Sequence, residues 1–270
     1  VALEELKEES ESGSLAAALV AFAIWFYHWK VSEKEGYPSP AAGTLRRWYM
    51  YILSTWGLVS LATATAQFVN AGVLSLPFFG GTLIQAGFWN RMTQTAAATI
   101  ITGGLIWYFH WFRMARGDFD SVLRQVYFYL LTVSGGAIAA LVAATVTVQR
   151  IITFSMGGVT VPLNNYFNFI GWAIPTVLIG TAIWAYHQKL AKEETERISE
   201  KRRSAERIHY YLMSFIGLGT MSAGIILLFG LMINLWIGVT GKVITEGATW
   251  WQGLLGLSLA LLVVGTPLWL

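Results

Sequence analysis

The chain has 270 residues, of which 55% are hydrophobic and only 12% are charged, with a net charge of +3. Soluble domains carry about 25% charged residues, so the composition excludes an ordinary soluble domain. The absence of cysteine excludes disulfides and thiolate metal sites. The chain begins at Val1 with an acidic segment and no basic n-region, so we expect it to lack its native start.

Apolar segments long enough to cross a bilayer follow one another along the chain. No Asp, Glu, Lys or Arg occurs in residues 48–90, 151–188 or 208–241, and about 20 apolar residues span a hydrocarbon core. We therefore predict an all-α, polytopic transmembrane bundle. Its seven predicted spans are residues 14–29, 48–70, 92–112, 122–148, 167–187, 210–235 and 251–270. We expect the full-length protein to continue into an eighth span.

The basic residues gather on one side of this topology. The connections 30–47, 113–124 and 188–207 hold 14 of the 18 Lys and Arg residues. The positive-inside rule places them in the cytoplasm of a cell whose inner (plasma) membrane holds the protein, with the N-terminal segment outside. The run 189–207 alternates acids and bases at helical spacing, which predicts a solvated helical extension.

The connections on the other side are short of charge and rich in glycine. The stretches FSMGGVTVPL (154–163) and IGVTGKVITEG (237–247) predict short extended or hairpin pieces around glycine turns.

The motif Ile-Trp-x-x-His ends three of the apolar segments. It occurs as IWFYHW from Ile24, IWYFHW from Ile106 and IWAYHQ from Ile183, and PLWL at the chain's end is a fourth, shortened copy. The motif residues are Trp25 and His28, Trp107 and His110, Trp184 and His187, and Trp269. We expect a histidine three residues beyond the last tryptophan.

A second block follows each basic connection. It reads RRWYMYILSTWG from Arg46, RQVYFYLLTVSG from Arg124 and ERIHYYLMSFIG from Glu206. Aligned without gaps, the copies share a tyrosine, a hydroxyl and a glycine, and Tyr49 and Tyr127 match His209. The shared positions are Tyr51, Tyr129 and Tyr211; Ser54, Thr132 and Ser214; and Gly57, Gly135 and Gly217.

The two blocks recur in the same order, which predicts a parallel repeat of membrane hairpins. The predicted parts are an acidic segment (1–13), three hairpins (14–91, 92–166 and 167–250) and the first helix of a fourth (251–270). Small residues four apart, such as Gly136 and Ala140, predict close helix contacts. We expect the motif histidines to contact the tyrosines of the same hairpin as structural latches.

The histidines admit two interpretations. Tryptophan and tyrosine anchor helices at membrane interfaces, and a histidine at a helix end favours the dipole. Neutral imidazole also ligates haem or chlorophyll. We favour anchoring and expect no cofactor and no metal; a bound pigment or haem would use His28, His110 and His187.

Apart from Arg124, near the start of the span 122–148, the spans carry none of the Asp, Glu, Lys or Arg residues that mark coupled carriers. Their polar residues include Gln67, Gln94 and Asn168, and Pro175 predicts a kink. No phosphate loop, zinc motif or nucleophile elbow occurs, so no catalytic residue is expected.

Two sets of charged residues receive structural interpretations. Asp118 and Asp120 are interpreted as caps for a helix beginning near Ser121. Arg46 and Arg124 are interpreted as snorkelling toward the lipid headgroups.

The Tyr-x-Tyr-Leu-x-Ser-x-x-Gly helix start, alternating with a helix ending in Trp-x-x-His-Trp, carries a resemblance that covers nearly all of residues 15–270. The chain resembles an uncharacterised group of bacterial multi-span membrane proteins, classed as a domain of unknown function and built of repeated hairpins. The resemblance implies a fold and no activity.

These observations favour a non-catalytic integral membrane protein, a scaffold or accessory subunit of a larger membrane complex. Its expected partners are the lipid bilayer and other membrane subunits, with no nucleic acid. The alternatives are a neutral-solute transporter or channel, favoured by a hydrated cavity near Gln67, Pro175 and the threonines, and a pigment- or haem-binding subunit.

Overall fold

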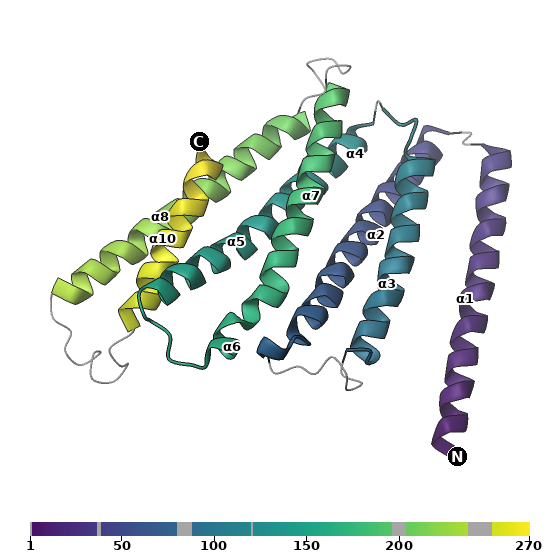
Figure 1. Cartoon of the computed structure of the whole chain (residues 1–270). Helices are drawn as coiled ribbons and strands as arrows, with labels where there is room; N and C mark the ends of the chain where they lie inside the picture. Colours follow the sequence, from purple (N-terminus) through teal and green to yellow (C-terminus); the bar gives the residue numbers. More distant parts are fainter. Residues whose placement is uncertain (1, 37–38, 80–87, 120, 196–203, 237–249) are drawn as a thin grey trace. The chain divides into compact units, whose positions relative to one another are not determined.

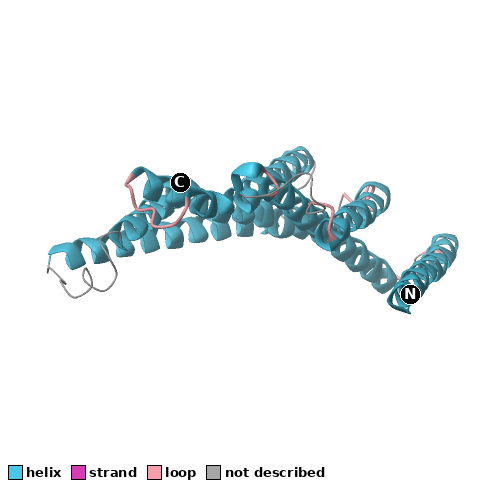
Figure 2. Ribbon diagram, turned by 60° about the horizontal axis from the view of Figure 1, so that its bottom comes forward, coloured by secondary structure: helices cyan, strands magenta, loops and turns pink. Residues whose placement is uncertain are grey.

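The structure is a computed structural model that describes residues 2–36, 39–79, 88–119, 121–195, 204–236 and 250–270, and these residues contain helices and no strand (Figure 2). The long helices are α1 (Ala2–Glu35), α2 (Pro40–Leu74), α3 (Arg91–Trp107), α5 (Ser134–Ser155), α7 (Ile170–Thr195), α8 (Ser204–Trp236) and α10 (Trp250–Trp269). The shorter ones are α4 (Val122–Gln125) and α6 (Leu163–Tyr166), the 3-10 turns η1 (Pro77–Phe79) and η4 (Phe167–Phe169), and the π-helical segments η2 (Tyr108–Met114) and η3 (Val126–Val133). The all-α prediction is confirmed for the described residues.

Among the described residues, five helical stretches are long and apolar enough to cross a membrane, which makes the protein a multi-pass integral membrane protein. They are Pro40–Leu74, Val122–Ser155, Leu163–Glu194, Glu206–Trp236 and Trp250–Trp269. The predicted spans at 14–29 and 92–112 fall in α1 and in α3 with η2, which are not among these five. As membrane spans, those two stay predictions.

Several predicted connections are partly helical. The acidic segment 1–13 belongs to α1 from Ala2 onward, and α7 extends the fifth span to Thr195. The predicted extended piece at 154–163 is wrong, because these residues form the end of α5, a turn and the start of α6. The similar prediction at 237–247 lies outside the described residues.

Residues 1–49 form one compact unit and residues 50–270 a second. In the first unit, α1 ends at Glu35 and is followed by Gly36, whose left-handed φ of 71° suits a residue without a Cβ. Helix α2 then begins behind Ser39, whose hydroxyl accepts the Ala42 amide at 3.1 Å. Pro40 occupies the first helical position, where its missing N–H has no partner to lose.

In the second unit, helices that are consecutive along the chain pack as close antiparallel pairs (Figure 1). A Cβ at Gly57 of α2 would lie 2.6 Å from the Trp107 nitrogen of α3. A Cβ at Gly136 of α5 would lie 2.9 Å from the Trp184 nitrogen of α7, and one at Gly217 of α8 would lie 2.5 Å from the Trp269 nitrogen of α10. These approaches leave no room for a side chain. Each pair joins the second helix of one predicted hairpin to the first helix of the next.

A glycine one turn before each tryptophan completes this contact. A Cβ at Gly103 would lie 3.0 Å from the Gly57 carbonyl oxygen, and one at Gly180 would lie 2.7 Å from the Gly136 carbonyl oxygen. A Cβ at Gly265 would lie 3.1 Å from the carbonyl oxygen of Gly217. The tryptophan of the repeated motif therefore marks a recurring helix crossing.

The π-helical segment η3 shifts this register by one residue in the second hairpin. The amide of Ser134 donates to the Tyr129 carbonyl, five residues back, so the helix accommodates one extra residue. A Cβ at Gly135, the glycine aligned by sequence, would have nothing within 4 Å. The expectation that Gly135 is equivalent to Gly57 and Gly217 is corrected, because Gly136 makes the contact.

Candidate functional site

Buried aromatic and charged side chains gather where η3 meets α2, η2 and α7. The buried members are Met50, Tyr51, Trp111, Ala115, Tyr127, Phe128, Tyr129 and Ala191. Three further side chains contact these residues through hydrogen bonds or ring packing: Trp107, Arg124 and His187. Glu194 joins them through its ion pair with Arg124. We call these twelve residues the helix-end cluster.

Tyr127 lies at the centre of the helix-end cluster and is fully buried. Its hydroxyl accepts a hydrogen bond from Trp107 Nε1 at 3.2 Å and lies 3.4 Å from His187 Nε2. Its ring stacks on Trp111 with 4.8 Å between centroids. Because these partners come from α3, η2 and α7, Tyr127 connects three helical segments through one side chain.

The bond between tryptophan and tyrosine occurs in two predicted hairpins. Trp25 Nε1 donates to the Tyr49 hydroxyl at 2.9 Å in the first unit, as Trp107 does to Tyr127 in the second. The contact between Tyr127 and His187 instead joins the second predicted hairpin to the third. The expected contact of His187 with a tyrosine at the start of the second helix of its own hairpin is thus replaced by a contact between hairpins.

The three motif histidines do not share one environment. His110 and His187 are buried, and Nδ1 of each lies 2.8 Å from the carbonyl oxygen four residues back, of Ile106 and Ile183. A carbonyl oxygen only accepts, so Nδ1 carries the proton and Nε2 of neutral His187 accepts from Tyr127. His28 is exposed within the unit formed by residues 1–49.

In the third predicted hairpin, the residues that align with the repeated motif make different contacts from those in the first two hairpins. His209, which replaces tyrosine, lies with Nδ1 2.9 Å from the Ser134 hydroxyl of α5 and with its ring 5.8 Å from that of Tyr129. Trp184 is 41% exposed and Tyr211 is 77% exposed, whereas Tyr51 and Tyr129 are buried. The aligned tyrosines Tyr51, Tyr129 and Tyr211 therefore lie in different surroundings.

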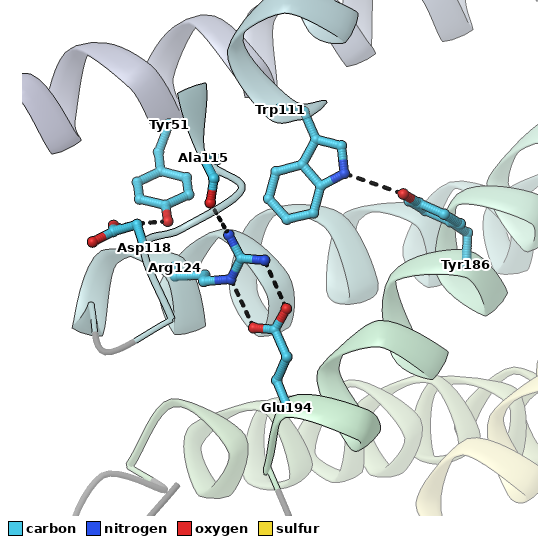
Figure 3. A network of polar contacts seen from close by, with 7 residues as sticks. All are labelled: Tyr51, Trp111, Ala115, Asp118, Arg124, Tyr186 and Glu194. Carbon is cyan, nitrogen blue, oxygen red and sulfur yellow. Dashed lines mark hydrogen bonds and ion pairs between the residues drawn. The ribbon is translucent and has the colours of Figure 1, made fainter. Parts of the chain in front are cut away.

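Arg124 and Glu194 form a buried ion pair across the helix-end cluster (Figure 3). The guanidinium of Arg124 donates two hydrogen bonds to the carboxylate of Glu194, from Nε to Oε2 at 2.7 Å and from Nη2 to Oε1 at 2.6 Å. Nη1 donates to the Ala115 carbonyl at 2.6 Å. This bidentate geometry is the strongest arrangement for such a pair, and it joins α4 to the end of α7.

Aromatic rings enclose the same guanidinium. Its central carbon lies 4.8 Å from the Trp111 ring centroid, 5.2 Å from that of Phe119 and 5.3 Å from that of Phe128. The interpretation of Arg124 as snorkelling toward the headgroups is therefore wrong, because Arg124 faces the protein interior. Arg46, its sequence counterpart, is exposed.

Asp118 contacts the cluster instead of capping the next helix. Its Oδ2 accepts a hydrogen bond from the Tyr51 hydroxyl at 3.0 Å (Figure 3). Ser121 occupies the cap position before α4, where it makes no side-chain cap bond. The capping interpretation is corrected for Asp118, and Asp120 lies outside the described residues.

Sequence reasoning missed four members or neighbours of this network: Trp111, Asp118, Tyr186 and Glu194. Trp111 Nε1 donates to the Tyr186 hydroxyl at 3.2 Å (Figure 3). A signal for Trp111 was present, since it ends the motif IWYFHW as Trp29 ends IWFYHW. Glu194 had no such signal, because it lies in a run of charges that reads as solvated.

The polar side chains of the helix-end cluster point toward the protein interior, and they form hydrogen bonds with one another or with the backbone. The carboxylate of Glu194 is taken by Arg124, and both nitrogens of His187 have neighbours. Within the described ranges, no three His, Asp or Glu side chains come close enough together to hold a metal ion. The arrangement joins helices and offers no free acid–base pair at its centre.

A groove of about 230 Å³ runs between α2, α5 and α7. Small residues such as Ala62, Gly135 and Ala139 line it, together with threonines. The threonine hydroxyls donate to carbonyls of their own helices, at 2.8 Å from Thr55 to Tyr51 and 2.6 Å from Thr176 to Trp172. The groove therefore presents an apolar surface.

Replacing Tyr127 by phenylalanine is expected to destabilise the protein by about 1–3 kcal/mol, because the buried Trp107 donor and the His187 acceptor lose their partner. Chemical unfolding in detergent micelles measures the change. Tyr108→Phe, at an exposed tyrosine beside Trp107, is the matched control and is expected to have little effect. Equal effects of the two substitutions would contradict the structural role of the hydroxyl.

A known family model matches the chain twice, and the two matches cover most of its length. They span residues 4–78 and 72–176, so one model describes two successive segments. No curated protein and no solved structure matches the chain. The chain belongs to the family described as Domain of unknown function (DUF5671).

Proposed function

We propose that this protein is a non-catalytic integral membrane protein that acts as a scaffold or accessory subunit of a larger membrane complex. The observation that carries the proposal is the inward-directed helix-end cluster. Its strongest polar groups, Arg124, Glu194 and Tyr127, bond other parts of the same chain. Such a network holds helices in register and leaves the reactive groups occupied.

The hairpin repeat belongs to the same proposal. The repeat has three proposed hairpins, at 14–91, 92–166 and 167–250. The two successive family matches, over residues 4–78 and 72–176, support the first two of them. The glycine contacts at Trp107, Trp184 and Trp269 add a second, independent support. A repeated helix pair presents similar helix surfaces again and again along the chain, which suits a protein that binds neighbouring subunits.

The proposed orientation places the connections 30–47, 113–124 and 188–207 in the cytoplasm and the N-terminal segment outside. It rests on the 14 basic residues in these connections. Arg124, one of these basic residues, forms an ion pair with Glu194. The pairing does not change the proposed orientation, because the positive-inside rule counts Lys and Arg whether or not they are paired.

The alternatives receive less support. A path for a polar solute needs free hydrogen-bonding groups, whereas the threonines of the groove bond their own helices. Haem ligation by His187 would have to displace Tyr127 and the rings of Trp107, Trp111 and Tyr186 packed around it. A lipid chain is the occupant that the apolar groove fits best.

Purification in a mild detergent, followed by identification of co-purifying proteins and an absorption spectrum, tests the proposal. We expect a defined set of membrane proteins in fixed ratio and no absorption band in the visible range. Disrupting a lipid-facing helix surface, for example with Phe229→Arg on exposed α8, is expected to release partners bound there. A coloured sample, or a monomeric protein without stoichiometric partners, would argue against the scaffold.

A further inference from the structure

A second arginine, Arg150, is held against aromatic rings at the end of α5 opposite Arg124. Its guanidinium carbon lies 5.1 Å from the ring centroid of Tyr166 and 6.0 Å from that of Phe169. The Tyr166 hydroxyl donates to the backbone carbonyl of Arg150 at 2.9 Å. These contacts fix where the cation lies, since the ring beneath it is tied to the same residue.

Arg124 is also surrounded by aromatic rings, and its positive charge is balanced by a partner. Its rings are accompanied by a bidentate carboxylate and a carbonyl oxygen. Arg150 has the rings, but within the described ranges no carboxylate pairs with it, and its Nε is buried without a hydrogen-bond acceptor. Among the described residues, the Arg150 site therefore lacks an anion like the carboxylate that balances the charge of Arg124.

The surroundings of Arg150 make that difference costly. Phe169 packs with Ala143 and Ala173 in a small apolar core, flanked by residues such as Val146 and Phe167. A cation beside such a core needs a compensating anion. Residues 149–169 contain no Asp or Glu, and Glu246, in a later connection, lies outside the described residues.

We propose that Arg150 binds the phosphate group of a phospholipid in the leaflet that this end of the bundle reaches. A guanidinium donates two parallel hydrogen bonds to a phosphate, as Arg124 does to a carboxylate. Because Nε is buried, the hydrogen bonds to the phosphate would come from Nη1 and Nη2. The neighbouring apolar side chains suit the acyl chains of the same lipid. Ordinary snorkelling needs only a mobile side chain, whereas this guanidinium is held in place.

The test uses the full chain purified in detergent and native mass spectrometry to measure retention of added phosphatidylglycerol. Diacylglycerol, which lacks the phosphate, is the ligand control. Arg150→Gln is expected to weaken phosphatidylglycerol retention by about tenfold, the effect of losing a hydrogen bond to a charged group. Arg91→Gln is the matched variant, because Arg91 is an exposed arginine on the same side of the bundle.

Three further arms keep the result decisive. Arg150→Lys keeps the charge without the planar fork and is expected to retain an intermediate amount, which also controls for misfolding of the glutamine variant. Equal losses in Arg150→Gln and Arg91→Gln, or no loss in either, would overturn the site. Displacement of the lipid by millimolar inorganic phosphate would assign the site to the free anion. Unchanged phosphatidylglycerol binding in Arg150→Gln together with altered binding in Glu246→Gln would place the lipid elsewhere.

Discussion

Replacing Glu194 by glutamine is expected to cost about 3–5 kcal/mol of unfolding free energy, the loss typical when one member of a buried ion pair is removed. The side chains of Arg124 and Glu194 are 6% and 12% exposed, so water cannot replace the lost carboxylate. The guanidinium would remain among Trp111, Phe119 and Phe128 with its charge uncompensated, because glutamine offers one neutral acceptor oxygen and replaces the other with an N–H donor. Unfolding in mixed micelles, followed by tryptophan fluorescence, measures the loss.

Glu193 provides the control for this experiment. It neighbours Glu194 on α7 but is exposed, so Glu193→Gln removes the same charge from the same turn at little cost. Replacing both partners by apolar residues, as in Arg124→Met with Glu194→Leu, is expected to recover most of the stability, because no unpaired charge is then buried. Similar losses for Glu193→Gln and Glu194→Gln would show that the pair contributes nothing specific.

The number and type of the long helices follow from composition, because charge-free apolar stretches have few other folds available in a bilayer. Helices such as α8 and α10 coincide with predicted spans for this reason. The helix ends were harder to predict. Helix α1 extends through the acidic segment and α7 extends into the charged connection, since residues outside the hydrocarbon core can be polar and still helical.

The sequence predicted which residues belong to the candidate site better than it predicted which of them contact one another. The repeat located Trp107, Tyr127 and His187, and all three meet in the structure. Pairing depends on how hairpins pack side by side, which one sequence does not encode locally. Arg124 illustrates the limit: its partner is 70 residues away, and Glu194 stands in a run of charges whose spacing also suits solvent.

Gly136→Ala is expected to destabilise the α5–α7 pair by about 1–3 kcal/mol, the usual cost of overpacking, whereas Gly135→Ala is not. A Cβ at Gly136 would lie 2.8 Å from the Gly180 oxygen and 2.9 Å from the Trp184 nitrogen, which are backbone atoms and cannot turn away. A Cβ at Gly135 would have nothing within 4 Å. Detergent-induced unfolding of the two variants in parallel measures the difference.

Because the two glycines are adjacent, both substitutions add the same methyl group to the same helix, and intrinsic propensity cancels between them. Alanine at Gly135 should even stabilise the helix by about 0.5–1 kcal/mol. The comparison therefore isolates the register that the π-helical segment η3 imposes. Without the extra residue that η3 accommodates, Gly135 would take the position that Gly57 and Gly217 hold in the other pairs. A larger loss for Gly135→Ala than for Gly136→Ala would mean that the helix is regular and that the sequence alignment, not the π-helical shift, describes this crossing.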